Sequence, residues 1–148
     1  MNWTCSRLRG LSVCDLYDAM ALRSRVFVVE QECVFLDADG ADRDSCHLLG
    51  RDEAGVLQAY LRIVDPGTKY AEPSIGRVVT SLASRGTGLG RLLMAEGLRQ
   101  CGIAWPGLPI RIGAQARLQA FYACFGFVRE GEDYIEDDIP HCEMVRPA

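Results

Sequence analysis

A glycine-rich loop between an apolar strand and a helix is the feature that most restricts how this chain can fold. Residues 75–82 read IGRVVTSL, whose β-branched Val78 and Val79 favour a strand, whereas residues 91–95 read RLLMA and favour a helix. The loop between them contains three glycines, Gly86, Gly88 and Gly90. Glycine adopts backbone angles that other residues avoid and leaves room beside the chain. This order predicts an uncovered helix N-terminus.

An uncovered helix start attracts phosphate, because its first N–H groups have no partner within the helix and lie at the positive end of its dipole. Arg85 and Arg91 add positive charge on either side of the loop. A nucleotide P-loop requires Gly-Lys-Ser/Thr after its last glycine, but Arg91 and Leu92 follow Gly90. A dinucleotide fingerprint requires a third glycine where this chain has Leu93. Both of these phosphate loops are therefore excluded.

A second pattern follows farther along the chain. Residues 110–114 (IRIGA) predict another strand. Residues 115–127, which end in QAFYACFGF, predict a helix that carries Phe-Tyr and is closed by Gly-Phe. Together with the R-x-x-G-x-G spacing of Arg85, Gly88 and Gly90, this order resembles the GNAT N-acetyltransferase superfamily. The stretches RVFVVEQ, GAQARLQAFYACFGF and DDIPH also resemble the ElaA family of small bacterial GNAT proteins over nearly the whole chain.

The resemblance implies an α/β fold of the mixed α+β kind, the GNAT acyl-CoA N-acyltransferase fold, in which helices flank a central mixed, mostly antiparallel sheet. A chain of 148 residues suits one domain over 1–148, because it can bury roughly two-thirds of its unfolded surface. We expect strands over residues 3–7, 46–50, 56–64, 75–82, 110–114, 127–134 and 141–146. We expect the helix after the glycine loop to stop at Gly102, and an acidic loop over 136–140.

For ligands, the resemblance implies acetyl-CoA as co-substrate. Its diphosphate would bind the N–H groups of the glycine loop, and its pantetheine arm would pair with a strand edge, as extended ligands do without special side chains. The cofactor-binding residues expected on this basis are Val78, Val79, Thr80, Arg85, Gly86, Thr87, Gly88, Leu89, Gly90, Arg91, Gln115 and Phe121. Gln115 either orients ligand amides or caps the helix that follows it.

For catalysis, the resemblance makes Tyr122 the residue that donates to the departing thiolate. A phenol with a pKa near ~10 is protonated at neutral pH and can donate to sulfur. An alkylamine is free base in only about one molecule in a thousand at pH 7, so its attack benefits from a proton acceptor. The sequence names no clear acceptor. We choose His141, which follows an acidic run; His47, Glu30 and a chain of water molecules remain alternatives.

The resemblance implies an enzyme that transfers an acetyl group from acetyl-CoA to a primary amine by direct attack in a ternary complex. The acceptor, a small-molecule or peptidyl amine, is not identified by the sequence. One alternative is an acyl-CoA-binding sensor or interaction module that has lost the chemistry. Another, suggested by Arg23 and Phe27, resembles the acyl-homoserine lactone synthases. A homodimer is compatible with the resemblance.

Composition restricts the partners. A net charge of −4 gives no general attraction to nucleic acid or anionic lipid. No apolar run reaches the roughly twenty residues of a membrane span, and the first residues lack the layout of a signal peptide, so we expect a cytoplasmic protein. The seven cysteines form no C-x-x-C pair, and the aspartates after residue 36 miss the spacing of a calcium loop. We therefore expect no metal.

One charged residue interrupts the pattern of the first helix. Ser12 can cap a helix whose apolar stripe consists of Val13, Leu16, Met20 and Phe27. Arg23 falls on that stripe, where a charge is costly unless it is paired or faces a cleft. We expect it to reach the surface or the carbonyls at the helix end, with a substrate contact as the second alternative. Asp37, Asp39, Asp42 and Asp44 then predict a solvated loop beside the acceptor entrance.

Overall fold

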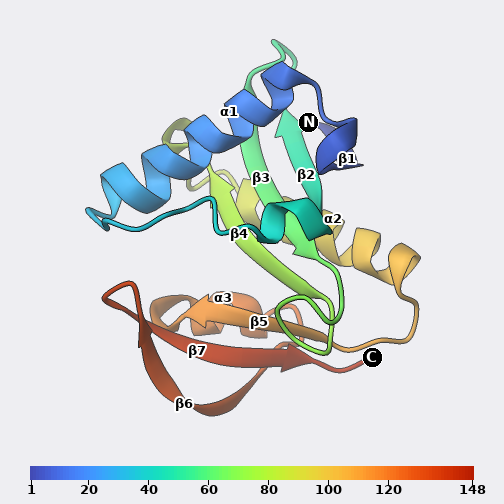
Figure 1. Ribbon diagram of the computed structural model, residues 1–148, viewed down its shortest axis with the longest axis vertical. Coiled ribbons are helices and arrows are strands. Elements are labelled where there is room, and N and C mark those ends of the chain that lie inside the picture. Colours follow the sequence, from blue (N-terminus) through green and yellow to red (C-terminus); the bar gives the residue numbers. More distant parts are fainter.

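Two antiparallel sheets that diverge from one another form the framework of the computed structural model, which describes residues 1–148 (Figure 1). The first sheet has the order β1-β2-β3-β4, with bounds Asn2–Arg7, Ser45–Arg51, Leu57–Val64 and Ser74–Thr80. The second has the order β5-β7-β6, with bounds Ile110–Gln115, Ile139–Arg146 and Val128–Glu136. The α-helices are α1 (Val13–Arg23), α2 (Leu89–Ala104) and α3 (Gln119–Ala123). A π-helical segment over Ser24–Glu30 follows α1 directly. Short 3-10 turns lie at Leu8–Gly10, Ala41–Asp44, Leu82–Ser84 and Ala116–Leu118. None of the helices combines the length and the apolar character needed to cross a membrane.

The first sheet is covered on both faces, by α1 on one and by α2 on the other (Figure 1). Successive side chains of a strand point to opposite faces, so neighbouring apolar residues serve different cores. Leu48 and Leu61 pack in the larger cluster, which includes Leu93 of α2. Leu49 and Tyr60 pack in the smaller cluster with residues of α1. This explains why the central strands are apolar without alternation.

The first helix begins where the sequence predicts. The Ser12 side chain accepts a hydrogen bond from the backbone N–H of Asp15 at 3.0 Å, which confirms the cap. The predicted stripe is partly wrong, because Val13 is exposed and the buried positions of α1 are Ala19, Leu22 and Arg23. The π-helical segment then carries the chain over the cleft described below.

Several boundaries differ from the predictions. The second helix continues past Gly102 to Ala104. The predicted helix over 115–127 is a 3-10 turn followed by the single turn α3, because Gln115 still belongs to β5 and Gly126, at φ 86°, ends the helical path. The predicted acidic loop is a tight hairpin between β6 and β7 whose two central residues, Asp137 and Asp138, both have positive φ.

The sheets separate between β4 and β5. The two strands start close together, with the N–H of Arg111 donating to the carbonyl of Pro73 at 3.1 Å, and Figure 1 shows them diverging toward their ends. A bulge bends β4: Arg77 and Val78 together lie opposite Leu61 of β3, and Arg77 has φ 52°. The predicted fold class is confirmed, with antiparallel strands flanked by helices, but the expected central sheet is divided into two at this point.

Neighbouring leucines of α2 test the packing. Leu93 is 0% exposed and Leu92 is 58% exposed. We expect Leu93→Ala to lower the free energy of unfolding by about 2–5 kcal/mol, because the surrounding core cannot close the cavity. The matched change Leu92→Ala should alter it by no more than about 0.5 kcal/mol. Urea denaturation of both variants measures the difference, and equal losses would contradict this description of the core.

Candidate active site

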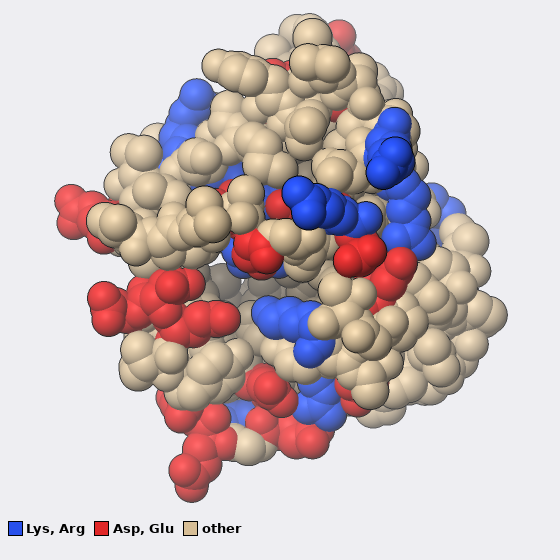
Figure 2. All heavy atoms as spheres, in the orientation of Figure 1, with Lys and Arg blue, Asp and Glu red and all other residues tan.

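A cleft of about 790 Å³ opens where β4 and β5 diverge. Its walls include Val78, Val79 and Thr80 of β4 on one side and Ile112 and Gly113 of β5 on the other. Figure 2 shows this face of the molecule hollowed, with acidic and basic side chains around the opening. The cleft is therefore bounded by a strand edge whose N–H and C=O groups are not used in a ladder with β5.

The start of α2 offers unpartnered N–H groups at one end of this cleft. Gly88 is its N-cap, at φ 86°, and no side chain caps the helix. The N–H groups of residues 86–90 donate to no acceptor within the protein; the first bonded ones are those of Arg91 and Leu92, both to the carbonyl of Gly88. Such a run of free donors at a helix start can hold an anion.

The three loop glycines do not all serve the same purpose. Gly86 and Gly88 have positive φ, of 76° and 86°, as the sequence predicts. Gly90 does not; a Cβ built at this position would lie 3.8 Å from the ring of Phe121. Phe121, a predicted cofactor-binding residue, thus packs beside the helix start and lines the cleft.

Arg85 and Glu30 face one another across the mouth of the cleft. They form a two-pronged ion pair, in which Nη2 of Arg85 lies 2.8 Å from Oε2 of Glu30. The hydrogen bonds from Arg85 hold the pKa of Glu30 below its usual value. A paired carboxylate of low pKa accepts a proton poorly, so the interpretation of Glu30 as a base is weakened.

Tyr122 lies on α3 and lines the cleft from below the loop. Its ring meets those of Phe121 and Phe127 edge to face, with centroids 5.1 and 6.1 Å apart. The hydroxyl makes no hydrogen bond within the protein. Nε of Arg62 is the side-chain polar atom that is fully buried and has no hydrogen-bond partner, so the Tyr122 hydroxyl keeps some exposure to solvent. Burial raises the pKa of Tyr122 to about 12, so the hydroxyl is protonated and free to donate to a ligand.

His141 reaches the same cleft from β7, opposite Gln115 of β5. Its Nδ1 lies 2.7 Å from the carbonyl oxygen of Ile139, which can only accept, so Nδ1 carries the proton of the neutral ring. Nε2 then has a lone pair, and it lies 3.7 Å from Oε2 of Glu136. Nε2 is thus the ring nitrogen that makes no hydrogen bond within the protein, and it lies beside a carboxylate.

His47 is excluded as a base. It is fully buried, and both ring nitrogens are occupied, one by the hydroxyl of Tyr60 at 2.7 Å and the other by the carbonyl of Asp42 at 2.9 Å. Burial lowers the pKa of His47, so the ring is held neutral. Its role is to support the core, and the prediction of it as an alternative base is wrong.

Gln115 does not cap the helix after it, because no side chain caps that turn. Its amide nitrogen donates to the side chain of Gln31, directly after the π-helical segment, at 3.2 Å, and its oxygen accepts from Arg117 at 3.1 Å. The capping alternative is therefore wrong. The alternative in which Gln115 orients ligand amides is compatible with its position in the cleft wall.

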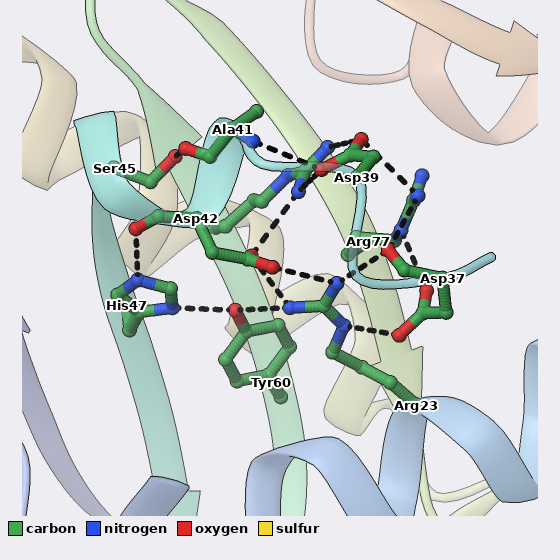
Figure 3. Close-up of polar contacts among 10 residues, drawn as sticks. Arg23, Asp37, Asp39, Ala41, Asp42, Ser45, His47, Tyr60 and Arg77 are labelled. Atoms are coloured by element: carbon green, nitrogen blue, oxygen red, sulfur yellow. Dashed lines mark hydrogen bonds and ion pairs between the residues drawn. The ribbon is translucent and has the colours of Figure 1, made fainter. Parts of the chain in front are cut away.

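Arg23 is the largest departure from the sequence predictions. Its side chain is 0% exposed and donates from Nε to Asp37 at 2.8 Å and from Nη1 to Asp42 at 2.6 Å (Figure 3). Every alternative predicted for Arg23 is wrong: it reaches neither the surface nor the carbonyls at the helix end, and it does not line the cleft. The prediction of a solvated aspartate loop is also wrong for Asp37 and Asp42, which are each 7% exposed.

Two further arginines complete this ion-pair cluster, which we define as Arg23, Arg62 and Arg77 with Asp37, Asp39 and Asp42. Arg62 of β3 binds Asp39 at 2.6 Å and Asp42 at 3.1 Å. Arg77 of β4 binds Asp37 at 2.8 Å. The sequence carried a signal for it, because Arg62 and Arg77 each interrupt an apolar strand, as Arg23 interrupts a helix stripe. Two of these arginines, Arg23 and Arg62, are buried, and a buried charge calls for a charged partner.

The chain is similar to known proteins over nearly its whole length. The acetyltransferase (GNAT) domain family matches residues 42–147. Protein ElaA of Escherichia coli (strain K12) is 46% identical over 150 residues, covering 99% of this chain and 96% of that protein. The crystal structure of an acyl-CoA N-acyltransferase from Pseudomonas aeruginosa superposes with a TM-score of 0.92 at 45% identity, and that of E. coli ElaA with 0.91 at 43%, each covering 98% of both chains.

The ion-pair cluster predicts how stability depends on pH. Burial alone would raise the pKa of Asp42, but hydrogen bonds and charges from Arg23 and Arg62 outweigh it and hold that pKa below 3.8. A lowered folded-state pKa contributes stability above the unfolded value, and this contribution is lost as pH falls through the folded value. We expect Asp42→Asn to cost roughly 3 kcal/mol at pH 7, because it leaves buried arginines undercompensated.

The difference between the unaltered protein and Asp42→Asn should begin to shrink as pH falls below the unfolded pKa of Asp42, and most of it should be lost by the lower folded pKa, because below that value the folded protein carries a neutral carboxyl at this position. Urea unfolding from neutral to acidic pH measures it. A difference that stays constant across this range would contradict the ionised, paired state of Asp42.

Proposed function

This chain belongs to the GNAT acetyltransferase family, and on that premise we propose that it transfers an acetyl group from acetyl-CoA to a primary amine by direct attack in a ternary complex. The single observation that supports this most is the cleft between β4 and β5, which runs from free helix-start amides to the unbonded hydroxyl of Tyr122. The residues fit an elongated ligand with an anionic end.

The coenzyme would be held mainly by backbone groups. The N–H groups of residues 86–90 would bind the diphosphate, and the free edge of β4 at Val78, Val79 and Thr80 would pair with the amides of the pantetheine arm. Arg85 can exchange Glu30 for phosphate, because this ion pair lies at the exposed mouth of the cleft. Gln115 and Phe121 would shape the wall on the far side.

In the transfer, the amine nitrogen forms a bond to the acetyl carbonyl carbon and the carbon–sulfur bond breaks. His141 would accept the proton that the amine loses, through its free Nε2 or through a bridging water molecule. Tyr122 would donate its proton to the departing sulfur and regain one from solvent. No residue becomes acetylated in this scheme.

The acceptor would enter beside β6 and β7. Glu136 and Asp137 line this part of the cleft without an arginine partner, so they favour a cationic amine, whether on a small molecule or a peptide. The synthase alternative loses its support, because Arg23 is buried among carboxylates. A binding module without chemistry is distinguished by turnover: coenzyme A release in the presence of a panel of primary amines.

Removal of the Tyr122 hydroxyl tests the proton donor. We expect Tyr122→Phe to lower kcat about a hundredfold or more while leaving the Kd for coenzyme A nearly unchanged, because the hydroxyl acts on charge that develops during the reaction. The control is Tyr17→Phe, at an exposed position of α1, which should keep full activity. Steady-state coenzyme A release measures both variants, and an unimpaired Tyr122→Phe enzyme would contradict the assigned role.

Strain in the glycine loop tests the diphosphate site. Gly88 and Gly107 both have positive φ, of 86° and 78°, and both face open space, but only Gly88 belongs to the loop beside the cleft. Alanine at such a backbone costs about 1–2 kcal/mol. We expect Gly88→Ala to weaken coenzyme A binding about tenfold by displacing the amides, and Gly107→Ala to leave it unchanged. Calorimetric titration compares them; equal affinities would argue against this loop as the site.

A further inference from the structure

At the bulge in β4, a residue other than glycine has a left-handed backbone conformation. Arg77 has φ 52°, and with Val78 it lies opposite the single residue Leu61 of β3. A residue with a Cβ adopts this conformation at a cost in free energy, so surrounding contacts must hold it. The segment that follows at once, Val78–Thr80, is the part of β4 that lines the cleft. The bulge therefore sets where this segment lies.

Asp37 holds Arg77 in this conformation. Its Oδ1 accepts from Nε of Arg77 at 2.8 Å, and its backbone carbonyl accepts from Nη2 at 3.0 Å. The ring of Phe35, two residues earlier in the same loop, lies under the guanidinium, 5.5 Å from its carbon. The hydrogen bonds of the Arg77 guanidinium to Asp37 and its contact with the ring of Phe35 thus both bind it to the same loop.

Asp37 is itself fixed from the opposite side. Its Oδ2 accepts from Nε of Arg23 at 2.8 Å, and its carbonyl also accepts from Nη2 of Arg23 at 3.0 Å. Figure 3 shows Asp37 between the two guanidinium groups, one from α1 and one from β4. With two arginines on both its carboxylate and its carbonyl, this residue has little freedom to move.

We propose that Asp37 is a positioning residue: by clamping Arg77 it fixes the bulge in β4 and so the place at which Val78–Thr80 present their backbone to the thioester arm of acetyl-CoA. The inference rests on the proposed function. Asp37 touches no reacting atom in this account. It acts through Arg77 and the strand.

Asp42 provides a matched comparison. It is as buried as Asp37, also binds Arg23, and belongs to the same loop region. Its second partner, however, is Arg62 of β3, and it forms no hydrogen bond or ion pair with Arg77. Loss of either carboxylate should destabilise the fold through Arg23, but only loss of Asp37 should release the bulge.

The experiment compares Asp37→Asn with Asp42→Asn on the full chain, with rates expressed per folded molecule. We expect both to lose stability. Asp37→Asn should lower kcat/KM for acetyl-CoA about 10- to 100-fold, because a misplaced thioester is attacked less often, whereas Asp42→Asn should stay within about twofold of the unaltered protein. Amide hydrogen exchange at Val78–Thr80 should quicken in Asp37→Asn alone.

A second variant separates positioning from stability. In Arg77→Gly, glycine adopts φ 52° without strain, so the fold should persist while the link to Asp37 is lost. Because Asp37 acts through Arg77, we expect that adding Asp37→Asn to Arg77→Gly lowers kcat/KM no further, whereas Asp37→Asn lowers it in the unaltered background. Activity and exchange in Asp37→Asn that match those of Asp42→Asn would overturn this inference. Failure of the unaltered protein to bind coenzyme A or acetylate any amine would instead overturn the proposed function and, with it, this role.

Discussion

The structure depends on the separation of β4 from β5. A strand edge within a protein carries N–H and C=O groups that need partners, and most sheets supply them with the next strand. Here β4 pairs with β3 on one side, while its other edge faces the cleft. The bulge at Arg77 lies in this open strand, and under the proposed function an extended ligand with amide groups would supply the partners that a further strand does not.

The ion-pair cluster explains how an open edge persists in so small a core. Three arginines and three aspartates neutralise one another, and they connect the first helix, the loop after it and two strands of the first sheet. Such a cluster adds little net stability, because desolvation offsets most of the attraction. Its directional hydrogen bonds instead fix one arrangement of the loop and the bulge. Nε of Arg62 is buried without a hydrogen-bond partner, which lowers the stability of this arrangement.

Features encoded locally could be predicted from the sequence. The Ser12 cap and the strand–loop–helix order around the glycines follow from neighbouring residues, whereas the choice of Tyr122, which lines the cleft, rested on the family resemblance. The arginines of the cluster stand out in apolar segments, but their pairing could not be predicted, because Arg23 and Asp37 meet Arg77 only after distant segments pack. The bulge had no local signal either, since arginine is an unusual choice for positive φ. Without it, one continuous sheet was the natural expectation.

A crystal structure of the protein with coenzyme A tests the central claim most directly, because it shows what fills the open edge of β4. The account predicts diphosphate oxygens within hydrogen-bond distance of the N–H groups of residues 86–90, the pantetheine arm alongside Val78–Thr80, and the sulfur within reach of the Tyr122 hydroxyl. Coenzyme A bound elsewhere, or a sulfur remote from Tyr122 while the edge of β4 stays unpaired, would contradict it.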